Sequence, residues 1–461
     1  MIKGLFDGFD SVSTKQWKQK IQFDLNGADF NDTLIWNSNE DIAVKPFYNA
    51  DDLKKHTPST SNISPWRIGQ TIFVAHTEKS NLKAVDAIKR GAEHIHFIIP
   101  SEENISIEHL IKNIDTDSIS IHLELQFLSV GFIKSIHTLP GKKNISIAVD
   151  IIGNLSKTGN WFNNLTDDFS KFETSFQSSQ SISINTSLYQ NAGANMVQQL
   201  AYTLAHANEY LNHLKLNPES SASIQTIFTV SVGSNYFFEI AKLRALRILW
   251  STLASEYQIN TDCYISAVPT KRNKTLYDYN TNMLRTTTEC MSAILGGANN
   301  VCNLPYDAIY HKDNEFGERI ARNQLLILKY ESAFDKVNNA ADGAYYIESL
   351  TEQLAEKALE LFKDIERNGG FLNQLKSGTI QRKIKENATK EQEQFNSGER
   401  ILLGTNKHSN PNDKMAEQLE IYPFVKINKR KTLIVPIIEK RIAEQIEQTR
   451  LKNEKQNEID N

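Results

Sequence analysis

The sequence has few of the features that mark secreted, membrane or nucleic-acid-binding proteins. It contains only 3 cysteines in 461 residues. Cys263, Cys290 and Cys302 are far apart and form no Cys-x-x-Cys pair, which indicates reduced thiols rather than a disulfide framework or a zinc site. No apolar run approaches the roughly 20 residues that a membrane span needs, and residues 1–7 lack the start of a secretory signal. The lack of a span and of a signal predicts a cytoplasmic protein. The formal net charge of only −4 predicts no general attraction to nucleic acid or to an anionic membrane.

Short β-rich runs alternate with longer amphipathic segments from about residue 70 onward. Several runs are almost entirely apolar and β-branched, which is typical of strands that are buried on both faces of a sheet. The eight runs are residues 71–75, 94–99, 118–123, 145–151, 181–184, 224–232, 263–268 and 299–304. Eight strand–helix alternations predict an α/β fold, a (β/α)8 TIM barrel, with a doubly wound open sheet as the alternative. In a barrel the active site forms at the carboxyl ends of the strands.

The segments on either side of the barrel differ from it in pattern. Residues 1–65 contain few periodic segments and several turn formers, including residues 57–61, and predict an irregular N-terminal arm. Residues 66–407 are expected to form the barrel with a helical extension, and residues 408–461 a charged C-terminal tail that includes a fraying helix over 436–461. The predicted helices span residues 194–214, 235–257, 319–331 and 348–368, the last of them stopped by Gly369 and Gly370.

Several ordered stretches between about residue 180 and residue 407 match motifs that occur in the same order in one known protein family. The clearest is the helix that begins Asn235-Tyr-Phe-Phe-Glu-Ile-Ala-Lys-Leu-Arg-Ala and ends at Trp250. The other matching stretches are Ala192-Gly193-Ala194, Gln199–Ala205, Asp278, Asn282, Arg285-Thr286, Glu289, Met291, Leu295-Gly296-Gly297, Arg319–Asn323, Asp342-Gly343, Tyr345-Tyr346, Glu348–Thr351, Gly369-Gly370 and Gly404–Lys407. Together these stretches resemble the methylmalonyl-CoA mutase family. A weaker match at Trp17, Gly27 and residues 46–48 resembles the N-terminal arm of the small subunits of that family.

The resemblance implies a (β/α)8 barrel that encloses the pantetheine of a CoA substrate, followed by a cobalamin-binding domain that caps it. In the family, adenosylcobalamin supplies a radical that interconverts succinyl-CoA and methylmalonyl-CoA. Such chemistry needs a hydrogen-bond donor at the thioester carbonyl, cations for the carboxylate and the CoA phosphates, and a cobalamin site.

The groups that the resemblance assigns to this chemistry are missing here. Leu188 occupies the position of the histidine that binds the thioester carbonyl, and Ser187 that of the preceding tyrosine. No arginine occurs in residues 151–185, where the family holds the substrate carboxylate. The remaining replacements are Tyr264 for an arginine, Ser266 for a histidine and Cys302 for a histidine, while Lys271 and Arg272 lie further along and residues 46–66 lack the family's N-terminal substrate loop.

The cobalamin-binding domain has no counterpart in these residues either. None of the 11 histidines has an aspartate two residues before it, as the family's cobalt-binding histidine does. Fewer than about 60 residues follow Lys407, whereas a domain of this kind needs roughly 100–150.

The sequence therefore predicts the non-catalytic small subunit of a heterodimeric, adenosylcobalamin-dependent methylmalonyl-CoA mutase. We expect no catalytic, cofactor-binding or metal-binding residues on this chain, adenosylcobalamin in the partner, and a homologous large subunit as that partner. The alternative is the barrel subunit of a two-piece acyl-CoA mutase with a separate cobalamin-binding protein, which would keep the histidine at position 188 and the carboxylate-binding arginine. A third possibility is a barrel reused for an unrelated ligand.

Four further features favour structural interpretations. His94 and His96 lie on one face of a strand without a convincing set of further ligands, which favours packing inside the barrel or at its rim over a metal site. Gly296 and Gly297 indicate a helix C-cap rather than a phosphate-binding turn. The basic run 429–431 favours a solvated face. The charged residues 439–455 fit a solvated helix and a partner-binding helix equally well.

Overall fold

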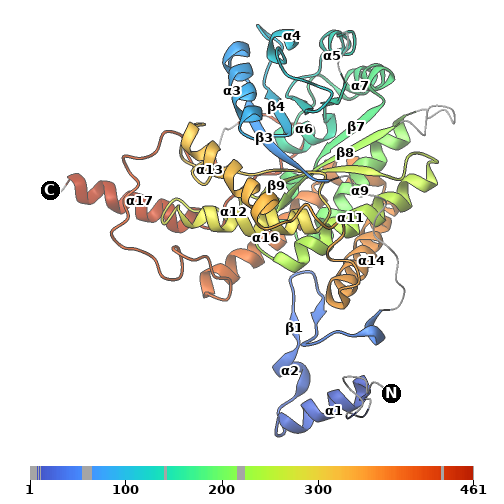
Figure 1. Ribbon diagram of the computed structural model, residues 1–461, viewed down its shortest axis with the longest axis vertical. Coiled ribbons are helices and arrows are strands. Elements are labelled where there is room, and N and C mark those ends of the chain that lie inside the picture. The colour runs from blue at the N-terminus through green and yellow to red at the C-terminus, as the bar shows by residue number, and fades with distance from the viewer. Residues whose placement is uncertain are drawn as a thin grey trace.

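The computed structural model describes residues 8, 10, 12–53, 65–139, 143–214, 224–426 and 430–459, and its body is a sheet of parallel strands surrounded by helices (Figure 1). The strands follow the order β6-β5-β4-β3-β10-β9-β8-β7. Strands β6 and β7 at its two ends also lie in contact, so the sheet is nearly closed into a barrel. The predicted (β/α)8 barrel is confirmed, and the open-sheet alternative is wrong. The strands are β3 Arg67–Phe73, β4 His94–Ile99, β5 Ser120–Leu125, β6 Ile145–Ala148, β7 Ser181–Asn185, β8 Gln225–Val232, β9 Cys263–Pro269 and β10 Asn300–Cys302.

Each strand comes from one of the eight predicted runs. Helices cover the outer face of the barrel, so the outward-facing side chains of the strands are mostly apolar, and this makes the strands recognisable in the sequence. Strand β4 spans residues 94–99, as predicted. Strand β3 begins at Arg67, four residues before the predicted run, because its alternating Ile68 and Gln70 are also buried.

Helices follow the strands and cover the barrel (Figure 1). Their bounds are α3 Thr77–Lys89, α4 Ile107–Leu110, α5 Val130–His137, α6 Ile151–Thr158, α7 Leu165–Ser179, α8 Ser187–Ala192, α9 Met196–His213, α11 Tyr236–Glu256, α12 Thr281–Leu295, α13 Glu315–Leu326, α14 Tyr345–Arg367, α15 Gly370–Lys376, α16 Thr379–Ser397 and α17 Glu444–Ile459. A π-helical turn, Ile327–Glu331, continues α13. The predicted glycine caps are confirmed: Gly297 and Gly369 have φ values of 85° and 96°, a region that a side chain disfavours.

The N-terminal arm projects from the barrel at the bottom of Figure 1. It contains helices α1 Thr14–Asp24 and α2 Phe30–Leu34, the hairpin of β1 Trp36–Asn37 and β2 Ala43–Val44, and the 3-10 turn η1 Ala50–Asp52. A capping box between Ser13 and Gln16 begins α1, which makes this part of the arm more regular than its lack of apolar periodicity predicts. No residue of α1 is buried.

The start of the C-terminal helix packs against other parts of the chain. Helix α17 begins at Glu444, whereas the predicted helix began at residue 436. Glu444 and Glu447 on its first turns are only 3% and 1% exposed, and Arg441 pairs with Glu447 at 2.5 Å. The charged segment 439–455 is thus partly buried against its own chain.

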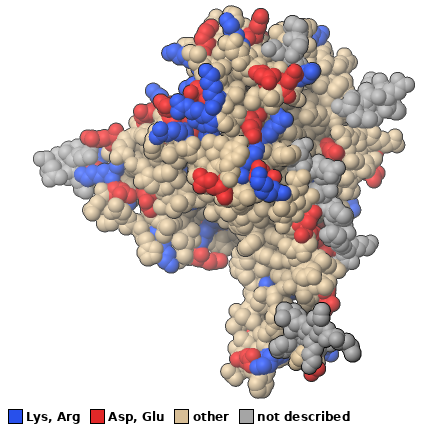
Figure 2. Space-filling view, in the orientation of Figure 1, with Lys and Arg blue, Asp and Glu red and all other residues tan. Residues whose placement is uncertain are grey.

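Both signs of charge are interspersed over the body in Figure 2, and the stem of the arm is mostly uncharged. Among the residues that the structure describes, no helix is both long and apolar enough to cross a membrane. Residues 1–7, the turn formers at 57–61 and Lys429 lie outside the described residues, as does most of the region 46–66 in which a substrate loop was sought.

Candidate functional site

The carboxyl ends of the strands form the mouth of the barrel, where sequence analysis placed the lost substrate groups. Leu188 lies in the first turn of α8, directly after β7, and is 7% exposed. It lines a cavity of about 310 Å³ at this mouth. Its apolar side chain can donate no hydrogen bond to a carbonyl group. The described residues that line this cavity include no arginine, and its cation is Lys157.

Of the replacements on β9 and β10, Ser266 and Cys302 are buried, and Tyr264 is half-buried. Ser266 accepts a hydrogen bond from the Asn300 side-chain amide at 2.9 Å. Burial raises the pKa of Cys302 to about 12 and that of Tyr264 to about 12. All these groups are therefore neutral at physiological pH, so they supply no positive charge for a carboxylate or a phosphate.

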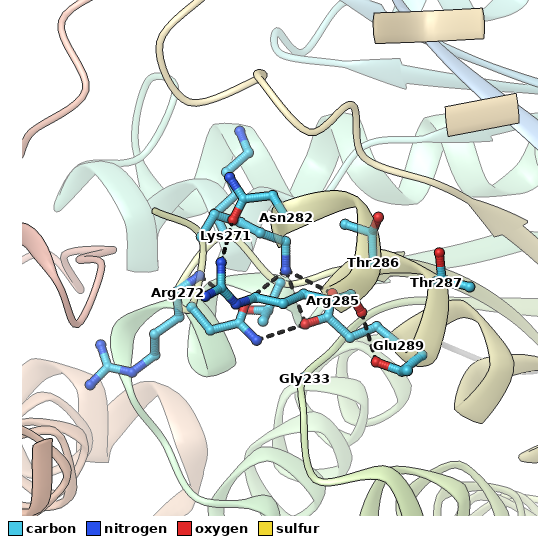
Figure 3. Close-up of polar contacts among 12 residues, drawn as sticks. Gly233, Lys271, Arg272, Asn282, Arg285, Thr286, Thr287 and Glu289 are labelled. Atoms are coloured by element: carbon cyan, nitrogen blue, oxygen red, sulfur yellow. Dashed lines mark hydrogen bonds and ion pairs between the residues drawn. The ribbon is translucent and has the colours of Figure 1, made fainter. Parts of the chain in front are cut away.

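Arg272 lies after β9, beside Lys271 (Figure 3), but its guanidinium is used within the chain. It bonds Glu391 on α16 at 2.5 Å and donates to the Lys440 carbonyl oxygen at 2.8 Å. A cation held by two internal acceptors is not available to a CoA phosphate. Lys271 beside it is exposed, and its backbone N–H donates to the Asn191 side chain.

Motif residues on α11 form buried ion pairs that join the helices around the barrel. Arg244 contacts Asp342 and donates to Glu348 at 2.6 Å, which fixes α11 against the start of α14. Glu239 accepts from the Gly233 N–H at 2.7 Å and from the Gln190 amide at 3.0 Å. The retained positions of this motif therefore hold backbone and helices in place.

The motif on α12 has the same kind of role (Figure 3). Lys274 Nζ lies 2.7 Å from one carboxylate oxygen of Glu289 and 3.0 Å from the other, and both side chains are almost fully buried. Asn282 accepts from the Thr275 N–H and from Arg285, and Arg285 also donates to the Leu403 carbonyl. These contacts fix the loop after β9 on α12.

The loop 404–407 closes on this motif through a glycine. Gly404 has a φ of 76°, and a Cβ atom there would lie 2.3 Å from a carboxylate oxygen of Asp278. Asn406 donates to the Phe395 and Arg400 carbonyl groups and orders the same loop. The space and the backbone conformation at position 404 both require glycine. The motif at 404–407 and the motif that begins at Asp278 are thus in direct contact in the fold.

The segment 430–442 runs across the mouth of the barrel. Leu433 donates to the Gly159 carbonyl after α6, Lys440 to the Asn191 carbonyl on α8, and Ile442 to the Arg272 carbonyl after β9. Ile434 and Ile437 are 5% and 3% exposed and join the main core. The face on which barrel enzymes bind their substrates is thus covered in part by the chain itself, a feature that sequence analysis missed.

The comparisons with known proteins agree with these motifs. The family model described as methylmalonyl-CoA mutase matches residues 106–457. The chain belongs to the methylmalonyl-CoA mutase family. It is 31% identical over 443 residues to the methylmalonyl-CoA mutase small subunit of Porphyromonas gingivalis, covering 88% of this chain and 71% of that protein.

Two further members of the mutase family are similar over most of this chain. The methylmalonyl-CoA mutase of Cereibacter sphaeroides is 28% identical, with 88% of this chain and 65% of that protein covered. The methylmalonyl-CoA mutase large subunit of Streptomyces virginiae is 24% identical, with 90% and 64% covered. The chain thus spans about two thirds of the length of these two relatives, and both small and large subunits occur among its relatives.

The two histidines for which a metal site was the alternative, His94 and His96, lie inside the barrel. His94 and His96 are 2% and 4% exposed, and His122 on β5 lies beside them with ring centroids 5.0 Å from His96. Among the described residues, no group of three or more His, Cys, Asp or Glu is arranged to hold a metal ion. The predicted location inside the barrel is confirmed. His122 was overlooked, although it alternates with Glu124 as His94 does with His96.

Proposed function

We propose that this chain is the non-catalytic small subunit of a heterodimeric methylmalonyl-CoA mutase, in which a homologous large subunit carries adenosylcobalamin and interconverts succinyl-CoA and methylmalonyl-CoA. The observation that carries the proposal is Leu188 at the barrel mouth, where the chemistry requires a donor. The internal use of Arg272 and the covering segment 430–442 support it. We further propose that the subunit stays in the cytosol.

The described residues do not fit a cobalamin at the mouth. The corrinoid of the family covers the carboxyl end of the barrel, and a histidine from the capping domain reaches its cobalt. Here Ile434, Ile437 and Glu439 of the segment 430–442 lie over that end. We therefore assign the cofactor to the partner and no reaction step to this chain.

The direct test is co-expression with the catalytic homologue, followed by purification of each chain alone and of the pair. We expect the pair to elute as a heterodimer and to convert methylmalonyl-CoA in the presence of adenosylcobalamin, whereas this chain alone shows no turnover. Turnover by this chain with only a separate cobalamin-binding protein would contradict the proposal and favour a two-piece mutase. A Leu188→Phe variant should leave the activity of the pair unchanged.

The arm offers a surface for the partner. Phe23 on α1 is 77% exposed and Trp17 is 46% exposed, although Trp17 stacks on Phe47 at a centroid distance of 4.0 Å. Large exposed aromatic side chains on a projecting element are typical of an interface that is buried in a complex. Obligate interfaces of this kind bury large apolar areas.

We expect Phe23→Glu to weaken the complex with the large subunit on the order of 10-fold or more, because a charge would be buried in an apolar contact. Leu82→Glu is the matched control, since Leu82 is 68% exposed on α3 and lies away from the arm. Sedimentation of the mixed subunits measures both. Equal dissociation constants for the two variants would exclude the arm as the contact.

A further inference from the structure

The cavity at the barrel mouth is built by small side chains on β6, β7 and β8. Ala148, Ser183 and Thr229 line it where the neighbouring β5 carries the large side chains His122 and Glu124. Glu124 pairs in register with Ala148, and Asn185 with Thr229, so these residues form one layer of the barrel interior. The cavity of about 310 Å³ falls at the lower end of the range of small-molecule sites.

The polar groups on the β5 side of this cavity accept hydrogen bonds. His122 Nδ1 lies 2.8 Å from the Ser146 hydroxyl, and that hydroxyl donates its proton to the Ile121 carbonyl group. With the hydroxyl proton directed to that carbonyl group, the matching tautomer of His122 carries its proton on Nδ1 and has a lone pair on Nε2. His122 is 3% exposed, and its Nε2 has no hydrogen-bond partner. A buried acceptor that lines a cavity can take a hydrogen bond from a bound ligand or from water.

Glu124 adds a negative charge next to this acceptor. Burial raises the pKa of its carboxyl group, but the hydrogen bond and the charge of His96 outweigh burial and hold the pKa below its ordinary value. Burial, with His96 as the second cause, lowers the pKa of His122 well below its ordinary value, so the imidazole stays neutral. The carboxylate is ionised, 3.2 Å from His96 Nε2.

An acyl thioester presents only acceptors at its carbonyl and carboxylate groups, so His122 and Glu124 would repel it. A ligand with a protonated amine would satisfy both groups. Its carbon chain would contact Leu125, Phe162 and Leu188 in the same cavity. A bare metal ion does not suit the site, because no suitable group of ligands is found among the described residues.

We propose that the cavity at the barrel mouth binds a small organic ammonium ion, with its N–H groups directed to His122 Nε2 and the Glu124 carboxylate. The exposed Lys157 at the rim gives a second anchor to ligands whose other end is a carboxylate. The cavity thus has the opposite hydrogen-bonding polarity to an acyl-CoA site, a function that goes beyond the proposed role as a small subunit.

Three probes of equal chain length test the polarity: n-butylammonium, n-butanol and n-butyrate, titrated into the full-length chain by ligand-observed NMR at neutral pH. We expect n-butylammonium to bind on the order of 10-fold more tightly than n-butanol, since a hydrogen bond to a charged group is worth more than a neutral one. 4-Aminobutyrate should bind at least as tightly as n-butylammonium because of Lys157. n-Butyrate should bind most weakly.

Variants separate the site from general attraction of cations. Glu124→Gln should weaken n-butylammonium binding on the order of 10-fold and leave n-butanol unchanged, while Glu439→Gln, which removes a carboxylate at the exposed rim of the same cavity, should change neither. Ala148→Leu fills the cavity and should abolish binding, with folding checked by circular dichroism.

Equal affinities for n-butylammonium and n-butanol, or no effect of Glu124→Gln, would overturn the proposal. Tighter binding of succinyl-pantetheine than of n-butylammonium would overturn it and also the proposed non-catalytic role, whereas no binding of any probe would overturn the ammonium site alone.

Discussion

Replacing Lys274 by methionine should lower the free energy of unfolding by about 3–5 kcal/mol, because the change leaves the buried Glu289 without its cation. Lys274 and Glu289 are both about 1% exposed, and no solvent can replace the lost ammonium group. Urea denaturation followed by circular dichroism measures the change. The pair also fixes the loop after β9, so the variant should lose stability throughout the barrel and not only in that loop.

Two controls distinguish the lost partner from lost packing. Replacing both residues, Lys274→Met with Glu289→Leu, should recover most of the stability, since an apolar pair of similar volume avoids the cost of burying charges. Lys171→Met removes an exposed ion pair with Asp167 on α7 and should leave the midpoint close to that of the wild type. A double variant as unstable as the single one would contradict the role of the unpaired charge.

Asp150→Ala should destabilise the fold by about 3–5 kcal/mol, because Asp150 links the ends of β6 and β7 by side-chain hydrogen bonds. No backbone pairing joins β6 to β7 in the described part of the chain. Asp150 follows β6 and accepts from the Asn185 N–H at the end of β7 at 3.0 Å, from His206 at 2.9 Å and from Tyr210 at 2.8 Å. His206 and Tyr210 are fully buried, and each would lose a partner at a cost of about 1–3 kcal/mol.

The pH dependence of this contact has a defined sign. Burial alone would raise the pKa of Asp150, but the charge and the hydrogen bond of His206 outweigh it and lower the pKa. The carboxylate therefore stabilises the fold fully above the unfolded-state pKa of about 3.9. This stabilisation is lost as the pH falls below that value. The difference in stability between the wild type and Asp150→Ala, measured by urea titration, should shrink on acidification, and a difference that grows would contradict the assignment.

The barrel could be predicted from the sequence because its strands are buried on both faces. Runs such as residues 71–75 combine β-branched and apolar side chains without interruption, a pattern that is typical of strands in a covered parallel sheet. Helix α16 was missed because its residues are mostly polar, and only Ile380, Ile384, Glu391 and Phe395 are buried. Helix α1 was missed because it buries nothing.

The candidate site was only partly predictable. The replacement of the carbonyl-binding histidine by Leu188 could be found by alignment with the family motifs, since such an alignment compares the residues position by position. The hydrogen-bond partners of the buried charged side chains could not be predicted, because they lie more than a hundred residues away in the sequence. Arg272 donates to Glu391, and the Leu276 N–H donates to Glu447. The course of the segment 430–442 could not be predicted, because its basic start at residues 430–431 favoured a solvated face. The apolar residues 433–438 that follow do not reveal which part of the fold they cover.

The covering segment also has a consequence for biosynthesis. Arg430 donates to the Thr158 carbonyl group and the Leu433 N–H donates to the Asn160 side chain, across sequence separations of 272 and 273 residues. Domains form progressively as the chain leaves the ribosome, and pairings between distant residues are slow to form. The strands will therefore be complete while the carboxyl end of the barrel is still uncovered, and that end is covered only after residues 430–442 have been translated. During this interval the newly made chain exposes the residues that the segment later covers, such as Ser156 and Gly159, and we expect chaperone binding to concentrate there.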